Sequence, residues 1–176
     1  MKRVARLVNH GPTVLASCRH GERSNLITLA WATPVSMEPP MLAIAIAPAR
    51  FSHDIIERSG EFVVNVPGSD LLHAVWHCGT VSGRDSDKFG GAGLTESPAQ
   101  VVRAPLVAEC FGHAECRVVE APVTGDHTLF VGEVVAAAVE ERAFDGHLLL
   151  TDPYHTLHHL GGPRFVTSAG QRLNAA

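Results

Sequence analysis

Short apolar runs of β type, separated by glycine- and proline-rich turns, fill most of this sequence and limit its fold more than any other feature. The alternation is clearest in Glu61–Val66, where Phe62 and Val64 face one way and Val63 and Asn65 face the other. The other predicted strands are Thr13–Cys18, Leu26–Ala32, Met41–Ala47, Cys110–Glu120, Thr128–Glu140 and Arg164–Ser168. Six or more strands with few short helices predict a mainly β fold, closed or partly closed into a barrel.

Two short helices are predicted between these strands. The first begins at Ser52, whose side chain can cap it, and stops at Gly60. The second covers Asp70–Cys78, with Ser69 as its cap and Gly79 as its C-terminal stop. We expect the apolar stripe of the second helix to pack in the core.

Composition narrows the function classes. The 176 residues are enough for one domain over 1–176, and 45% hydrophobic with 18% charged residues is typical of a globular chain. A net charge of -4 without a long basic run argues against nucleic acid as a partner. No apolar run is long enough to span a membrane, and the N-terminus lacks the apolar segment of a secretion signal, so we expect a cytoplasmic protein.

The cysteines and histidines give weak metal signals. None of the four cysteines is in C-x-x-C spacing, so they are interpreted as buried apolar residues or free thiols. His155-x-x-His158-His159 comes nearest to ligand spacing. Exposed histidines, or histidines on a helix surface, are the simpler interpretation, and no metal site is predicted.

An anion site is one interpretation of Ala47–His53. A buried strand ends at Pro48, Arg50 follows, and Ser52 stands at the predicted helix start. Helix N-termini and arginine both suit phosphate. The alternative is a serine that only caps the helix and an arginine that only meets water.

The stretch VSGRDSDKF (81–89) admits three interpretations. Ser82 and Gly83 would let the backbone approach a ligand, while Arg84 and Lys88 supply positive charge. The acidic residues in the segment also match part of a calcium loop, but Phe89 stands where that loop needs an oxygen ligand. A plain surface turn is the third interpretation.

Two further stretches carry weaker signals. Asn25–Ser36 places small polar residues near the end of an apolar strand, where backbone groups could meet a flat hydrogen-bonding ring. Trp31, within it, is more often a core aromatic. In Gly125-Asp126-His127, the histidine could contact a ligand or be an ordinary turn residue.

Taken together and in order, these motifs resemble the flavin reductase-like family of FMN-binding split barrels, which includes flavoredoxin. The resemblance spans roughly residues 10–168. The motifs that carry it are N-x-x-T-x-x-W (25–31), PVSMEPP (34–40), RFSH (50–53), EFVVNVP (61–67), CGTVSGRDSDKF (78–89) and GDHTLFVGEVV (125–135).

The resemblance implies a split β-barrel that binds FMN, with FAD as an alternative cofactor, near the interface of a homodimer. It implies that NADH or NADPH reduces the flavin, and that the electrons pass to an acceptor or to a partner monooxygenase. Two alternatives stay open: a flavoredoxin-type electron carrier reduced by a protein partner, and a flavin-binding protein without turnover.

The implied cofactor contacts differ in kind along the chain. The flavin ring would contact backbone groups of Ala30, Trp31, Ala32 and Thr33, and the phosphate would contact Arg50 and Ser52. Ser82 and Gly83 would add backbone contacts, and Lys88 and Phe89 would close the site. Ala47 and Asn65 are the remaining cofactor contacts that the resemblance implies. His127 would lie on the nicotinamide side.

Two features depart from the family pattern. Related members often carry a tyrosine after a glycine near the flavin, and Phe165 stands at the matching position in Gly161–Phe165, without the hydroxyl. The histidine-rich segment at residues 154–159 has no counterpart in the pattern.

Overall fold

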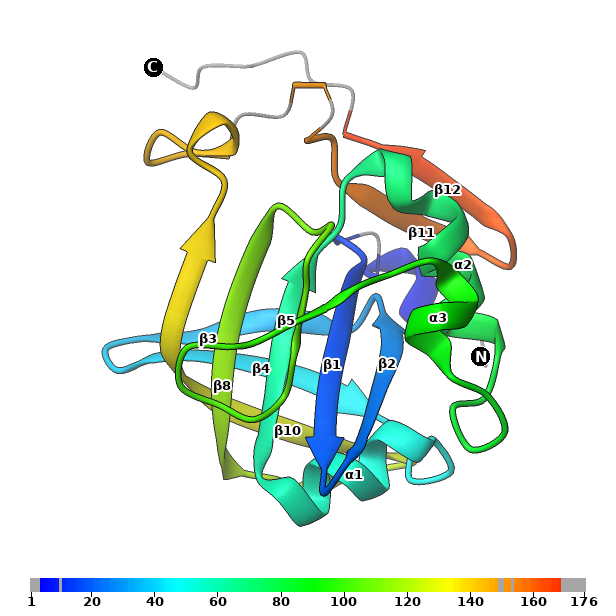
Figure 1. The fold of residues 1–176 in the computed structure, drawn as a ribbon, viewed down its shortest axis with the longest axis vertical. Coiled ribbons are helices and arrows are strands. Elements are labelled where there is room, and N and C mark those ends of the chain that lie inside the picture. The colour runs from blue at the N-terminus through cyan, green and yellow to red at the C-terminus, as the bar shows by residue number, and fades with distance from the viewer. Residues whose placement is uncertain (1–3, 10, 149–150, 153, 169–176) are drawn as a thin grey trace.

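One strongly curved sheet of eight antiparallel strands forms the body of the protein in the computed structural model, which describes residues 4–9, 11–148, 151–152 and 154–168. Neighbouring strands follow the order β2-β1-β5-β8-β10-β4-β3, and β9 pairs with β10. Their bounds are β1 Val14–His20, β2 Arg23–Leu29, β3 Ala32–Met37, β4 Pro40–Ile46, β5 Glu61–Val66, β8 Gly112–Glu120, β9 Val123–Thr124 and β10 His127–Val139. In Figure 1, β1, β5 and β8 run steeply while β3 and β4 cross behind them, so the sheet folds over itself as a barrel. The predicted mainly β barrel is confirmed.

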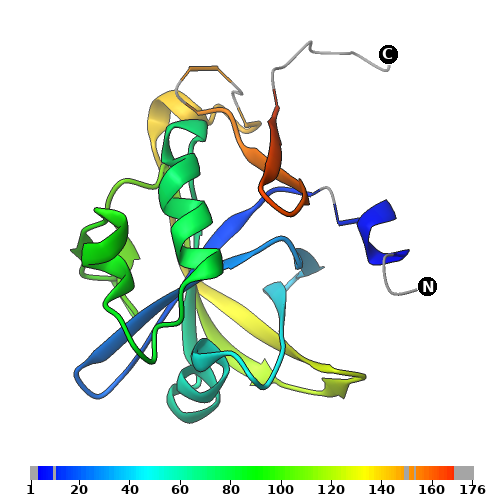
Figure 2. The same cartoon turned by 90° about the vertical axis from the view of Figure 1, so that its right-hand side faces the viewer.

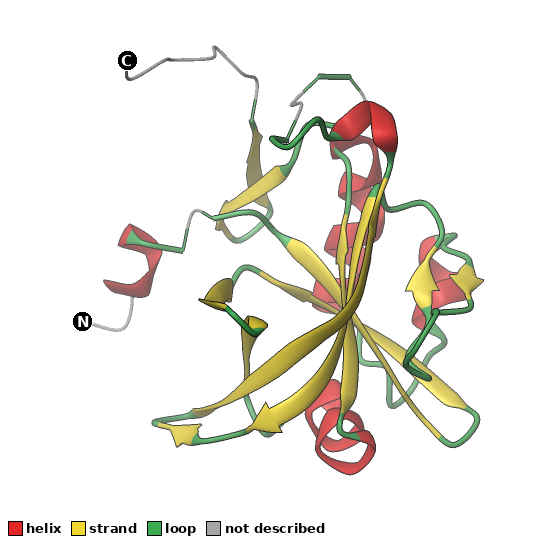
Figure 3. Ribbon diagram, turned by 90° about the vertical axis from the view of Figure 1, so that its left-hand side faces the viewer, coloured by secondary structure: helices red, strands yellow, loops and turns green. Residues whose placement is uncertain are grey.

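Helix α1 (Phe51–Ser59) lies under one end of the barrel, as Figures 2 and 3 also show. It places Ile55 and Ile56 in the barrel's hydrophobic core. Gly60 ends it with φ 68°, as predicted, since the left-handed region suits glycine. The predicted Ser52 cap is wrong: Arg50 is the N-cap residue, and no side chain caps the helix.

Helix α2 (Leu72–Thr80) packs on the outer face of β1 and β2 together with the short helix α3 (Lys88–Ala92). Because side chains alternate along β1, Ala16 points into the barrel core while Leu15 points outward to the helices. A 3-10 turn, Ser69–Leu71, precedes α2, so Ser69 does not cap it, and the helix continues past the predicted stop at residue 79.

A separate hairpin, β11 (Leu157–Gly161) and β12 (Arg164–Thr167), lies beside α2 (Figure 1). Two isolated β-bridges, from residue 12 to residue 158 and from residue 68 to residue 156, connect the hairpin and the residue before it to segments next to β1 and β5. β12 matches the predicted last strand. β11 was not predicted. It contains His158 and His159 of the histidine-rich segment, so these two residues lie on a strand and not on a helix.

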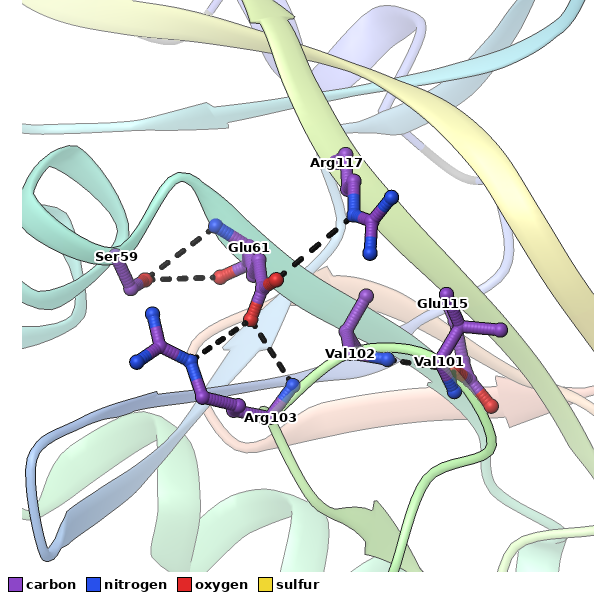
Figure 4. A network of polar contacts seen from close by, with 7 residues as sticks. All are labelled: Ser59, Glu61, Val101, Val102, Arg103, Glu115 and Arg117. Atoms are coloured by element: carbon purple, nitrogen blue, oxygen red, sulfur yellow. Dashed lines mark hydrogen bonds and ion pairs between the residues drawn. The ribbon is translucent and has the colours of Figure 1, made fainter.

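Two carboxylates hold the long loop before β8 against the sheet (Figure 4). Glu115 is buried and accepts hydrogen bonds from the backbone N–H groups of residues 100–102, at 2.8, 2.7 and 3.1 Å. Glu61 accepts from the Arg103 N–H at 2.9 Å and forms ion pairs with the side chains of Arg103 and Arg117. These acids are structural, because their oxygens are used by the loop. The short pair β6 (Glu96–Ser97) and β7 (Leu106–Val107) brackets this loop.

The cysteines are all free and buried, which confirms their interpretation as apolar residues. Within the described residues, no helix combines the length and hydropathy needed to cross a membrane.

Candidate functional site

A pocket of about 470 Å³, here called the main pocket, opens where β2, the β4–α1 connection and the segment after α2 meet. It brings together residues from Asn9 to His159, which lie 150 positions apart in the sequence. Nine of the predicted site residues line it: Ala30, Trp31, Ala47, Arg50, Ser52, Ser82, Gly83, Lys88 and His127.

Arg50 gives the main pocket its free positive charge. It is exposed at the N-terminus of the nine-residue helix α1, and its guanidinium has no hydrogen-bond or ion-pair partner among the described residues. Ser52, in the first turn, is buried, accepts a hydrogen bond from the Asn25 amide at 2.8 Å and also bonds the Cys18 side chain. An unpaired arginine, a hydroxyl and an uncapped helix N-terminus together suit an anionic group such as phosphate.

The VSGRDSDKF loop is fixed by Arg23. Its guanidinium donates to the backbone oxygens of Gly83 and Arg84 at 2.7 and 2.8 Å. Arg84 in turn pairs with Asp54 at 2.8 Å. The charge of Arg84, predicted to attract a ligand, is thus used within the fold, and Arg84 does not line the pocket.

Lys88 lies in the pocket wall but is buried. Its ammonium donates to the backbone oxygens of Leu26 at 2.8 Å and Cys78 at 2.7 Å, so it joins β2 to α2. Burial lowers the pKa of Lys88. Lys88 therefore holds the pocket wall together and is not free to bond a ligand through these contacts.

Two aromatic rings, those of Trp31 and His127, meet just beyond the C-terminal end of β2. Trp31 is half exposed, not a core aromatic, and its ring lies 4.7 Å from that of His127, tilted by 40°. Nδ1 of His127 is 2.7 Å from a carboxylate oxygen of Asp126. This contact holds the pKa of Asp126 below its usual value and fixes the orientation of the imidazole.

Four predicted residues do not line the main pocket: Ala32, Thr33, Asn65 and Phe89. Ala32 and Thr33 begin β3, directly beyond the rim at Trp31. Phe89 is buried in the core between α2 and α3, and its predicted role in closing the site stays a prediction.

Asn65 is fully buried and satisfies other parts of the fold. Its amide nitrogen donates to the oxygen of Leu15, and its amide oxygen accepts from the Val107 N–H at 2.9 Å. Asn65 thus does not line the main pocket, its hydrogen bonds are made inside the protein, and its role as a cofactor contact stays a prediction.

Several lining residues were missed by sequence reasoning. They come from β2, from the end of α2 and from two remote segments: Asn25, Ile27, Cys78, Thr80, Val81, Asn9 and His159. The first five stand in motifs that were singled out, but nothing in the motifs showed which side chains face the pocket. His159 was singled out only for its spacing from His155 and His158, which gave no reason to place it at this pocket.

Metal binding has no support from side-chain clustering. No group of three or more His, Cys, Asp or Glu residues gathers in the part of the chain that the structure describes. Asp87, one of the calcium-loop residues, instead caps α3 by accepting from the N–H groups of residues 89 and 90.

The pocket therefore combines a cationic end with an apolar and aromatic wall, which suits a planar ring that carries a phosphate. The model of the flavin reductase like domain matches residues 5–158. The chain belongs to the flavin reductase-like family. The split-barrel fold predicted from the motifs is confirmed with it.

Two relatives illustrate the range of this family. The uncharacterised protein YddH of Escherichia coli is 41% identical over 97% of this chain and 93% of its own length. The reductase component of an FADH2-dependent resorcinol hydroxylase from Rhizobium is 31% identical over 73% of this chain and 70% of its own length.

A solved structure shows the same fold. The FMN-binding domain of a flavin reductase-like enzyme from Shewanella baltica has a TM-score of 0.88 and 28% identity, covering 99% of this chain and 94% of that one. The two chains therefore share one fold over nearly their whole length.

Proposed function

We propose that this protein is an NAD(P)H-dependent flavin reductase that binds FMN in the main pocket. The observation that carries the proposal is the exposed Arg50, which has no partner among the described residues and stands beside an uncapped helix N-terminus. A phosphate-bearing ligand would supply the missing partner. FMN-binding structural relatives and a monooxygenase reductase component in the family support the assignment.

Arg50, Ser52 and Ser82 would hold the phosphate. Gly83 and Lys88 shape the wall beside it, Gly83 by letting the loop lie directly against Asn25 and Lys88 by joining β2 to α2. Ala30 and Ala47 line the pocket with small side chains, so that their backbone groups are accessible to a ring. The roles of Ala32 and Thr33 in ring binding stay predictions.

FMN, when bound, supplies the exchange of two electrons. The chain's own residues supply orientation and charge. We propose that His127, held by Asp126 and packed on Trp31, contacts the nicotinamide of NADH or NADPH.

The wider setting follows from the same proposal. A homodimer is supported by β3 at one end of the sheet order, where Val35 and Met37 are 49% and 89% exposed. A partner monooxygenase is supported by the Rhizobium relative. Four free cysteines suit the reducing cytoplasm.

The first test is the absorption spectrum of the purified protein with added FMN, followed by addition of NADH or NADPH. We expect flavin binding and nucleotide oxidation faster than with FMN alone. Binding without acceleration by either nucleotide would favour the alternatives, a flavoredoxin-type carrier or a flavin-binding protein without turnover. No binding of FMN or FAD would remove the flavin assignment altogether.

The second test concerns Arg50 alone. Arg50→Ala should weaken FMN by about ten- to a hundredfold, the range for losing hydrogen bonds to a charged group, and should leave riboflavin almost unchanged. Arg58→Ala is the matched control, since Arg58 is an exposed arginine in the last turn of the same helix. Equal losses for FMN and riboflavin would place Arg50 elsewhere in the site.

A further inference from the structure

His53 is a buried histidine for which the proposed function has no use so far. It lies in the first turn of α1, is 6% exposed and does not line the main pocket. Its Nε2 lies 2.8 Å from Oγ1 of Thr128, which is 4% exposed. Its ring meets that of Phe130 edge to face, with 5.1 Å between the ring centres. A hydrogen bond between two buried side chains thus joins α1 to β10 behind the pocket wall.

This bond connects two parts of the pocket that are far apart in the sequence. On one side, Arg50 ends the connection between β4 and α1, and its backbone oxygen accepts from the N–H of His53 at 3.0 Å. On the other side, His127 lines the pocket and directly precedes Thr128. Thr128 also pairs with Ile46, the last residue of β4. The connection that ends at Arg50 is therefore held to β10 at both of its ends.

The two sides of the bond differ in how firmly they are anchored. Helix α1 is fixed by its own apolar residues in the barrel core. The start of β10 follows an exposed turn, since residues 119–126 are all exposed and Thr128 is the first buried residue of the strand. Because side chains alternate along a strand, Thr128 points into the barrel and His127 points to the other face, where it meets Trp31. Loss of the bond should therefore displace the start of β10 more than the helix.

We propose that His53 is a positioning residue, which acts through Thr128 to hold the imidazole of His127 against Trp31. The role in the reaction rests on the proposed function, because the position of His127 matters there only if it contacts the nicotinamide. The bond then keeps a fixed spacing between two groups of the main pocket, the guanidinium of Arg50 and the imidazole of His127.

The two tryptophans allow a test without any cofactor, because Trp31 packs against His127 while Trp76 lies on α2. Protein containing 5-fluorotryptophan should give two fluorine resonances, assigned with Trp76→Phe. His53→Phe keeps a ring and removes Nε2, and Thr128→Val keeps the shape and removes the hydroxyl. Both should move the Trp31 resonance toward its position in His127→Ala and leave the Trp76 resonance in place.

Thr128→Ser is the matched control, because it keeps the hydroxyl and should keep the parent's Trp31 resonance. An unmoved Trp31 resonance in a folded His53→Phe or Thr128→Val protein would overturn the proposal. If one of these two variants loses the parent's Trp76 resonance, the other decides. If both lose it, the bond is needed for the whole fold and the positioning role is wrong.

A double-mutant cycle tests the link to the reaction. With FMN bound, His53→Phe should lower kcat/KM for NADH or NADPH about three- to tenfold, the range for one lost hydrogen bond, and change FMN affinity less than about twofold. In a His127→Ala background the same substitution should have almost no further effect, because no imidazole is left to position.

Equal losses of kcat/KM in both backgrounds, or a loss of FMN affinity as large as the loss of kcat/KM, would show a general structural role and overturn the proposal. The proposed function can fail separately. If the parent does not accelerate oxidation of NADH or NADPH, the reductase assignment is wrong, and the fluorine resonances still decide whether His53 positions His127.

Discussion

The contact between Gly83 and Asn25 gives the sharpest prediction about the main pocket. A Cβ added at Gly83 would lie 1.9 Å from the Asn25 amide oxygen and 2.6 Å from its Cγ. Asn25 has little room to move, since it is 3% exposed and its amide nitrogen donates to Ser52 at 2.8 Å. Ordinary contact begins at 3.4 Å, so Gly83→Ala must move the amide oxygen by about 1.5 Å.

The expected cost follows from two effects. Overpacking a tight site costs about 1–3 kcal/mol, and a buried hydrogen bond left without its partner costs about 1–3 kcal/mol. We therefore expect Gly83→Ala to lower the free energy of unfolding by about 2–6 kcal/mol. FMN affinity should fall as well, because the displaced Asn25 no longer holds Ser52.

Guanidinium denaturation followed by circular dichroism measures the loss of stability. Gly11→Ala is the matched control, because no atom lies within 4 Å of a Cβ at Gly11; it should be neutral or slightly stabilising. The decisive comparison is the double variant with Asn25→Ala. If the clash is the cause, Gly83→Ala costs much less once Asn25 has been shortened. The same cost in both backgrounds would refute the reasoning.

Two further predictions concern buried groups. Asn65→Leu should lower the free energy of unfolding by about 3 kcal/mol or more, measured by urea denaturation, because it removes the acceptor of the Val107 N–H and the amide that bonds the Leu15 oxygen and the Ser17 hydroxyl. The FMN affinity of the folded protein should change less than about twofold, and a selective loss of FMN binding would place Asn65 in the site. Burial raises the pKa of Cys18 from 9.0 to about 12, so between these values the unfolded chain has lost the thiol proton and the native protein keeps it. The free energy of unfolding therefore falls as the pH rises through this window. Cys18→Ala should reduce that fall by about 1.4 kcal/mol per pH unit, measured by urea denaturation at pH 9.5 and 10.5 with a reductant present. Equal pH dependence of the free energy of unfolding in the parent and in Cys18→Ala would contradict the assignment.

Strand positions were predictable because they depend on local alternation and turn residues. Glu61–Val66 matches β5 residue for residue, and its two sides face two different clusters. β11 was missed because a run with adjacent histidines has no apolar alternation, and pairing with β12 and the links to the barrel decide its conformation instead.

Site residues were harder to predict because a motif does not state which way each side chain points. Asn65 and Arg50 are both polar residues near strand ends. Asn65 turns inward because a backbone N–H 42 residues further along, at Val107, needs an acceptor, and no local pattern reveals that. Arg50 stays outward because it precedes a helix that starts beside the pocket, a local feature that the sequence does display.

The basic residues around VSGRDSDKF show how the fold leaves one cation for a ligand. Arg23 and Arg84 both lie over the Phe51 ring, at 4.4 and 5.2 Å, and both also hold backbone or carboxylate oxygens. Lys88 is committed to two carbonyl oxygens inside the wall. Of these described cations, Arg50 alone is both at the pocket and unpaired. The positive charges in and around VSGRDSDKF therefore hold the pocket wall in place through contacts within the protein. The unpaired guanidinium of Arg50 is the one of these charges that can bind an anionic ligand.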